Sequence, residues 1–145
     1  MEAKIWKREF TLEAINDLNA ACLPGHLGIE ITEVGSDYLR GTMPVDKHTH
    51  QPMGLLHGGA SVVLAESLGS IAGMLCVEDY NKTIVGVEIN ANHLRSARKG
   101  FVTGTVKPVK IGKTLQVWNI EIVNEQQQLI CVSRLTVAVV DMNRY

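Results

Sequence analysis

The sequence predicts an α+β fold in which an antiparallel sheet of about six strands wraps around one long central helix. Three observations lead to this prediction. The run from Gly58 to Val77 is almost wholly apolar and long enough for a helix that is buried on most sides. Segments with strand-like patterns precede and follow it. Those that follow are joined by short connections, which suit antiparallel neighbours because a parallel crossover needs about a dozen residues.

The part of the chain before this run predicts a short helix and a β-hairpin. Thr11 is a suitable N-cap for a helix that carries the apolar residues Ile15 and Leu18 on one face. Pro24-Gly25 is expected to end this helix. A hairpin and a polar loop follow, with strands at 28–34 and 38–45, a turn at 35–37 and the loop at 46–56.

After the long helix the sequence predicts four more strands, separated by polar or turn-rich residues. They occupy 84–94, 101–109, 115–124 and 129–140. A sheet of this size would enclose the helix, and its exposed edges would favour pairing with a second copy of the chain. At 145 residues the chain is expected to form one domain, residues 1–145.

Composition narrows the functional classes. Fourteen basic and 15 acidic residues give a net charge of −1, so a nucleic-acid-binding surface is not expected. Three cysteines in apolar surroundings, none in a CxxC pair, predict reduced, buried thiols: Cys22, Cys76 and Cys131. The N-terminus is charged where a secretory signal has its apolar core, which predicts a cytoplasmic protein.

The long apolar run also has the length of a membrane-spanning helix. Glu66 stands in its middle, however, and a charged residue at the centre of a bilayer costs about 2.5–3.5 kcal/mol on insertion scales. We therefore expect the core helix of a soluble protein, with no membrane contact.

Two features of this helix carry chemistry. Gly58-Gly59 begins it, so unpaired backbone amides converge there at the positive end of the helix dipole. Glycines let a ligand oxygen approach these amides closely, which suits an oxyanion hole for a carbonyl that becomes tetrahedral. Glu66 lies two turns further on among apolar neighbours, where poor solvation makes a carboxylate a stronger base.

Three more polar residues accompany these features. Ser70 lies on the same helical face as Glu66, four residues on, while Gln51 and His57 precede the helix. Each residue also has a purely structural interpretation: Glu66 as part of a core ion pair, His57-Gly58-Gly59 as a tight helix entry, Gln51 as a loop residue and Ser70 as a packing residue. Their combination favours a catalytic site.

Other kinds of site are not indicated. His48, His50 and His57 have no acidic or thiol residue at zinc-ligand spacing, so no metal is expected. The chain has no Gly-x-Ser-x-Gly elbow, phosphate loop or Gly-x-Gly-x-x-Gly motif. Ser67 and Ser70 therefore lack the context of a serine hydrolase.

The segment from His50 to Ser70 resembles the hotdog-fold acyl-CoA thioesterases. Its run Gln-Pro-Met-Gly-Leu-Leu-His-Gly-Gly-Ala-Ser-Val-Val-Leu-Ala-Glu-Ser is similar to the aryl-CoA hydrolase branch with a glutamate in the helix, above all to bacterial 1,4-dihydroxy-2-naphthoyl-CoA hydrolases of menaquinone synthesis. The similarity spans nearly the whole chain, including residues 5–7, 43–46, 87–93 and 116–118.

This resemblance implies a homodimer with a continuous sheet, commonly paired into a tetramer, and active sites at the subunit interface. Glu66 of one subunit would act as nucleophile or general base, while Gln51, His57 and Gly58 come from the other. The Gly58 amide would hold the thioester carbonyl, and Ser70 would position the hydrolytic water. Coenzyme A is part of the substrate, and no separate cofactor is expected. Its implied contacts are Gly86, His93, Leu94, Arg95 and Ser96 in one segment, and Lys110, Ile111, Gly112, Lys113, Thr114 and Leu115 in another.

Basic residues support these coenzyme A contacts. Arginine and lysine bind phosphates through charge-assisted hydrogen bonds, and coenzyme A carries a pyrophosphate and a 3′-phosphate. A solvated basic rim remains the alternative for any one of them. They are Arg95, Arg98, Lys99, Lys107, Lys110 and Lys113.

The expected reaction is hydrolysis of an acyl-CoA thioester to a free acid and coenzyme A. Met53, Leu55 and Val63 are expected beside the acyl group, which would be aromatic or a medium aliphatic chain, and such pockets separate these by only about 1–3 kcal/mol. The resemblance favours the 1,4-dihydroxy-2-naphthoyl group. The alternatives are proofreading of mis-acylated carrier proteins in siderophore synthesis, a hotdog dehydratase, and a non-catalytic acyl-CoA binder.

Overall fold

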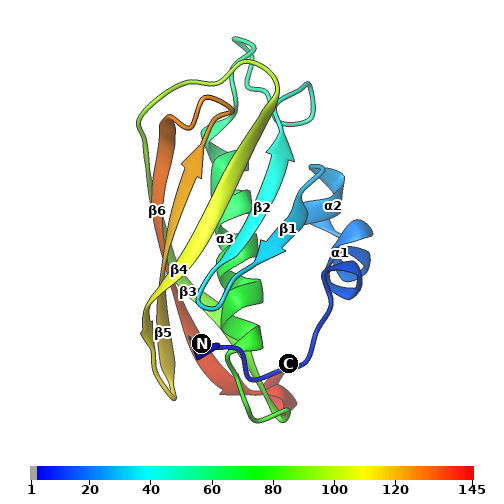
Figure 1. Ribbon diagram of the computed structural model, residues 1–145, viewed down its shortest axis with the longest axis vertical. Coiled ribbons are helices and arrows are strands. Elements are labelled where there is room, and N and C mark those ends of the chain that lie inside the picture. Colours follow the sequence, from blue (N-terminus) through cyan, green and yellow to red (C-terminus); the bar gives the residue numbers. More distant parts are fainter. Residues whose placement is uncertain (1–2) are drawn as a thin grey trace.

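A six-stranded antiparallel sheet curls around helix α3 in the computed structural model, which describes residues 3–145 (Figure 1). The strands are β1 (Glu30–Val34), β2 (Leu39–Pro44), β3 (Lys82–His93), β4 (Phe101–Ile111), β5 (Leu115–Val123) and β6 (Leu129–Asp141). The helices are α1 (Leu12–Ala20), α2 (Leu23–His26) and α3 (Gly58–Leu75), with a 3-10 turn η1 (Met142–Arg144) at the end. The strand order is β1-β2-β4-β5-β6-β3, which leaves β1 and β3 at the edges. The predicted α+β arrangement is confirmed.

The core lies between α3 and the inner face of the sheet. Leu64, Leu68 and Ala72 of α3 are fully buried, and they pack in one cluster with fully buried strand residues such as Trp118 and Leu135. Burial alternates along β5, as expected for a strand with one face toward a helix. By length and composition α3 would be able to cross a membrane, but half of it is buried inside the protein. The core therefore accounts for its apolar character.

The structure corrects some predicted boundaries. Helix α1 begins after the predicted cap, Thr11, but it already ends at Ala20. Pro24 lies in the first turn of a separate helix, α2, because proline suits the start of a helix, where the amide it lacks would have no partner. Strand β4 continues to Ile111, two residues beyond the prediction. Cys22 is exposed rather than buried, and its thiol contacts the Leu18 carbonyl at 3.7 Å.

A buried polar network joins α3 to the sheet. The side-chain amide of Gln116 donates to the Gly73 carbonyl at 3.2 Å and accepts the indole N–H of Trp118 at 3.0 Å. Both side chains are enclosed, with Gln116 1% exposed and Trp118 0% exposed. Leaving a buried donor without a partner destabilises a protein by about 1–3 kcal/mol.

We expect Gln116→Leu to lower the free energy of unfolding by about 1–3 kcal/mol, because it leaves the Trp118 indole without its acceptor. Urea unfolding at constant m-value would measure the loss. Gln126→Leu is the control, since Gln126 is exposed in the loop after β5 and its side chain makes no hydrogen bond to the described residues. Equal stability of the two variants would contradict the role of the network.

Candidate active site

The loop before α3 is held at both ends, and this fixes the start of the helix. Thr49 is buried, and its carbonyl accepts the His57 amide at 2.8 Å. The Leu56 amide donates to the Ala97 carbonyl at 2.7 Å, which ties the loop to the segment after β3. The loop therefore brings the first turn of α3 beside the end of β3.

A cavity of about 410 Å³ lies at this junction. It brings together the predicted catalytic residues Gln51 and Gly58 and most of the first predicted coenzyme A segment. Its lining residues are Gln51, Leu55, Leu56, Gly58, Ser61, His93, Leu94, Arg95, Ser96 and Ile130. His93 lies directly against the helix start: a Cβ on Gly58 would come within 2.8 Å of its Nε2 atom. A glycine at this position keeps both the imidazole and the helix amide accessible to the cavity.

Hydrogen-bond donors gather around the helix start. The Gly58 N–H has no acceptor among residues 3–145. His57 caps the helix, with Nδ1 accepting the Gly59 amide at 2.8 Å, so the proton of its neutral ring is on Nε2. The side-chain oxygen Oε1 of Gln51 accepts the Met53 amide, which leaves the side-chain NH₂ group as the donor for a ligand. Such an arrangement is suited to a carbonyl oxygen that gains negative charge.

Glu66 lies in a different place, a shallow cavity of about 240 Å³ on the α1–α2 side of α3. Ser70 lines the same cavity, as the helical spacing predicts, together with Asn19, Pro24, Ser67 and Ile71. The carboxylate is half-buried and has no hydrogen bond or ion pair within the described part of the chain. A structural ion pair is therefore not its role in this chain.

Gly86 lies against the Glu66 carboxylate, whereas the family resemblance implied that it contacts coenzyme A. A Cβ at this position would lie 2.9 Å from Glu66 Oε1. The contact occurs at a β-bulge, where the pairing of β3 with β6 shifts between Gly86 and Glu88. A glycine within a strand indicates a bulge or a close approach, and this signal was present in the sequence.

We expect Gly86→Ala to reduce kcat by roughly 10–100-fold, because a displacement of about 1 Å in a catalytic group can lower the rate 10²-fold. The methyl group would press on Glu66 Oε1, the free end of a flexible side chain, so folding should be little affected. Steady-state kinetics would measure the loss. In a Glu66→Gln background the same substitution should have almost no further effect, and additive losses would show that Gly86 acts elsewhere.

Gly58 and Glu66 of one chain do not meet. Eight residues of α-helix separate them by about 12 Å along the axis. A reacting group must lie about 3–3.5 Å from the atom it attacks. The two residues also line different cavities. Gly58 and Glu66 of one chain therefore lie in two separate places.

An apolar cavity of about 300 Å³ adjoins the Glu66 cavity, with Asn19, Ser70 and Ile71 common to both. Its other lining residues come from α1, α3 and β3: Ile15, Leu18, Met74, Leu75 and Ile84. None of the residues expected beside the acyl group lines it. Met53 is 76% exposed, Leu55 lines the cavity at the helix start, and Val63 packs against the core.

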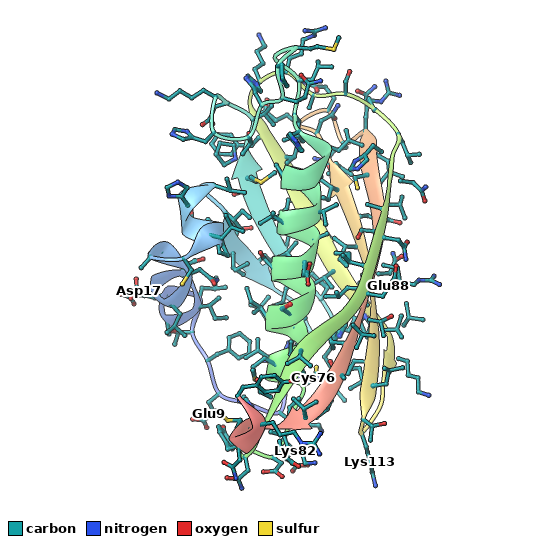
Figure 2. All side chains as sticks on the ribbon, turned by 180° about the vertical axis from the view of Figure 1, so that it is seen from behind. Glu9, Asp17, Cys76, Lys82, Glu88 and Lys113 are labelled. Carbon is teal, nitrogen blue, oxygen red and sulfur yellow. The ribbon has the colours of Figure 1, made fainter. Side chains whose placement is uncertain are left out.

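The second predicted coenzyme A segment lies at the other end of the sheet. Leu115 pairs with Ala138 of β6, whereas His93 pairs with Cys131 of the same strand. Along β6 the positions of Leu115 and His93 are therefore about 23 Å apart. Figure 2 shows Lys113 at the tip of the β4–β5 hairpin, near the end of the molecule that carries Cys76 and Lys82. Residues 111–113 line a cavity of about 380 Å³ there. The predicted basic residues thus form no single cluster within one chain.

The buried cysteines are unsuited to catalysis. Burial raises the pKa of the Cys76 thiol to about 12 and also raises the pKa of the Cys131 thiol. A thiolate is the reactive form of cysteine, so neither residue is a nucleophile at neutral pH. Among residues 3–145 no group of three or more His, Cys, Asp or Glu residues is placed to hold a metal ion.

Known proteins share this sequence and fold. The thioesterase superfamily model matches residues 53–131, which include the start of α3, Glu66 and His93. The chain is 57% identical to 1,4-dihydroxy-2-naphthoyl-CoA hydrolase of Escherichia coli (strain K12), over 93% of this chain and 98% of that protein. It is 52% identical to proofreading thioesterase EntH of Cronobacter turicensis, again over 93% and 98%.

A solved structure agrees over the same length. The crystal structure of a thioesterase from Haemophilus influenzae superimposes with a TM-score of 0.93 at 52% identity, covering 95% of this chain and 96% of that one. Sequence and fold agree along nearly the whole chain, including the helix that carries Gly58 and Glu66. The chain therefore belongs to the thioesterase superfamily and is a thioester hydrolase with the hotdog fold.

Proposed function

We propose that this enzyme hydrolyses aromatic acyl-CoA thioesters, with 1,4-dihydroxy-2-naphthoyl-CoA as its substrate, in the cytoplasm and as a step of menaquinone biosynthesis. The observation that carries the proposal is the apolar cavity beside Glu66, bounded by Leu18, Ile71 and Met74. A flat ring system buried there would place its thioester carbon next to the carboxylate. The name of the Escherichia coli relative, at 57% identity, supports this choice of acyl group.

The active site is proposed to form between two copies of the chain. One copy supplies Glu66 and Ser70, and the other supplies Gln51, His57 and the Gly58 amide. The separation of about 12 Å between the two positions along the helix axis and their two separate cavities support this arrangement.

Strand β3 is the proposed dimer interface. It is a 12-residue edge strand whose central part is exposed, with Val87 59% exposed. Long unprotected edges are uncommon because their unpaired backbone groups recruit other strands. Antiparallel pairing of two β3 strands would join the sheets, and two such dimers would form the expected tetramer.

The same pairing explains the divided coenzyme A residues. Antiparallel strands exchange ends, so the β4–β5 hairpin of one copy would lie at the same end as His93–Ser96 of the other. Lys110 and Lys113 would then join Arg95 around the phosphates of coenzyme A. Coenzyme A enters only as part of the substrate, and no other cofactor is needed.

In the proposed mechanism the thioester carbonyl accepts the Gly58 N–H, with the positive end of the α3 dipole behind it. Gln51 and the Nε2–H of His57 are the nearest further donors. Glu66 then either attacks the carbonyl carbon and forms a mixed anhydride, which water cleaves, or removes a proton from a water that attacks directly. Ser70 holds that water. In both routes the C–S bond breaks and coenzyme A leaves as the thiol.

A thiol-release assay on three substrates tests the proposal. We expect kcat/KM to be highest for 1,4-dihydroxy-2-naphthoyl-CoA and lower for benzoyl-CoA and an aroylated carrier protein. The EntH relative favours the carrier protein as the second candidate, at 52% identity. The highest kcat/KM on the carrier protein would replace the first proposal with proofreading. Tight binding without thiol release would indicate a binding protein, and formation of an enoyl thioester would indicate a dehydratase.

Mixing two inactive variants tests the shared site. Glu66→Gln and Gly58→Ala chains are unfolded and refolded together at equal amounts. Half of the dimers are then mixed, and one of the two sites in each mixed dimer is intact, so about a quarter of wild-type activity should return. If the refolded mixture is no more active than the two variants alone, both groups of residues act within one chain.

A further inference from the structure

We propose that Ser61 is a catalytic residue: its hydroxyl is a second hydrogen-bond donor, beside the Gly58 amide, to the carbonyl oxygen of the thioester. The inference rests on the proposed function and deepens it.

The burial of Ser61 makes its hydroxyl unusual. The residue is 2% exposed, on the first turn of α3. Within residues 3–145 the hydroxyl makes no hydrogen bond, although the backbone amide of Ser61 donates to the His57 carbonyl at 3.3 Å. No fully enclosed side-chain oxygen or nitrogen of the described chain lacks a partner. The Ser61 hydroxyl is therefore not fully enclosed, and it opens onto the cavity that this residue lines.

The helix directs this hydroxyl toward the proposed carbonyl position. Gly58 and Ser61 are three residues apart and line the same cavity, whereas Gly59 and Ala60 between them do not. In an α-helix each Cα–Cβ bond tilts toward the N-terminus. The Ser61 side chain thus leans toward the turn that begins with the free Gly58 amide. A carbonyl oxygen on that amide would be within reach of the hydroxyl.

A contrasting serine shows what a structural hydroxyl looks like here. Ser133 of β6 is as deeply buried, at 1% exposed, and its hydroxyl donates to the Asn90 carbonyl at 2.7 Å. The Ser61 hydroxyl instead faces the cavity, so no bond within the described chain uses its hydrogen in the free enzyme. A substrate carbonyl would supply the missing partner, and the bond would strengthen as negative charge develops on that oxygen.

Kinetics of three variants test the inference on the wild-type enzyme's best thioester substrate. Ser61→Ala should lower kcat by about 10–100-fold with KM changed less than threefold, because loss of one oxyanion donor acts mainly in the transition state. Ser61→Cys, whose thiol is a weaker donor of similar size, should have a kcat between those of the wild type and Ser61→Ala. Thermal unfolding of Ser61→Ala should match the wild type, since no bond is lost in the free enzyme. Ser133→Ala, the matched control, should unfold at a lower temperature and keep its kcat.

A spectroscopic measurement reports on the carbonyl directly. In a Glu66→Gln background, which holds substrate without turnover, the infrared carbonyl stretch of bound 13C-labelled benzoyl-CoA should rise when Ser61 is changed to alanine. An unchanged stretching frequency together with an unchanged kcat would overturn the inference. A raised KM with unchanged kcat would also overturn it, because the hydroxyl would then bind the coenzyme A part of the substrate and not the carbonyl. If the wild type releases no thiol from any thioester, the proposed function itself fails and the role of Ser61 fails with it. An active wild type matched by Ser61→Ala refutes only the role of Ser61.

Discussion

Glu66→Gln is expected to reduce kcat by roughly 10²–10⁴-fold while KM changes only a few fold, because the amide can neither attack a thioester nor accept a proton from water. The substitution preserves size and removes no contact, since Glu66 makes no hydrogen bond or ion pair within residues 3–145. We therefore expect the stability of the variant to equal or exceed that of the wild type. Steady-state kinetics and urea unfolding on the same preparation would check both expectations.

A matched control separates the carboxylate from general charge effects. Glu121→Gln removes one negative charge from the exposed face of β5, away from every cavity described above, and should leave kcat unchanged. Turnover near the wild-type value in Glu66→Gln would remove Glu66 from the mechanism. If the loss is found, single turnover in H₂18O tests for the covalent route. Label in the Glu66 carboxylate supports the nucleophile, because water has then cleaved a mixed anhydride at the glutamyl carbon. Label confined to the acid product is expected both for the general base and for an anhydride that water cleaves at the acyl carbon.

The sequence was sufficient to predict the arrangement of elements because the relevant signals are local. Helix α3 begins at Gly58, the predicted residue, since the glycine pair after a polar loop marks a helix entry. The boundary errors also have local causes. Pro24 suits the start of a helix as well as the end of one, and β4 extends to Ile111 because pairing with β5 continues past the bulge near Pro108.

The candidate site was only partly predictable, because contacts between distant segments leave no local pattern. Spacing along one helix placed Glu66 and Ser70 on one cavity correctly. It gave no indication that Gly86, 20 residues later, would touch the carboxylate, or that α1 would line the apolar cavity. Met53 could not be placed from the sequence, because an apolar side chain in a loop carries no information about which way it points; it is 76% exposed in the single chain.

Gly58→Ala is expected to reduce kcat by roughly 10²–10³-fold, the loss typical of one oxyanion-hole donor. The added Cβ would lie 2.8 Å from His93 Nε2 and beside the free amide, in the space that the carbonyl oxygen is proposed to occupy. Stability should remain the same or rise by about 0.4–1 kcal/mol, because Gly58 is not among the glycines with positive φ and alanine suits a helix better. Activity and stability are thus expected to move in opposite directions, as measured by kinetics and urea unfolding.

The double variant Gly58→Ala/His93→Ala shows which contact is responsible. If the methyl group acts only by displacing the imidazole, removing that ring makes room, and the double variant should be no slower than His93→Ala alone. If the methyl group blocks the carbonyl oxygen, the 10²–10³-fold loss should persist in the double variant. We expect the second result, since the amide is fixed by the first turn of α3 whereas the His93 ring is free to rotate away. Wild-type turnover in Gly58→Ala itself would show that the start of α3 does not hold the carbonyl, and the mixing experiment would then have to pair Glu66→Gln with a Gln51 variant.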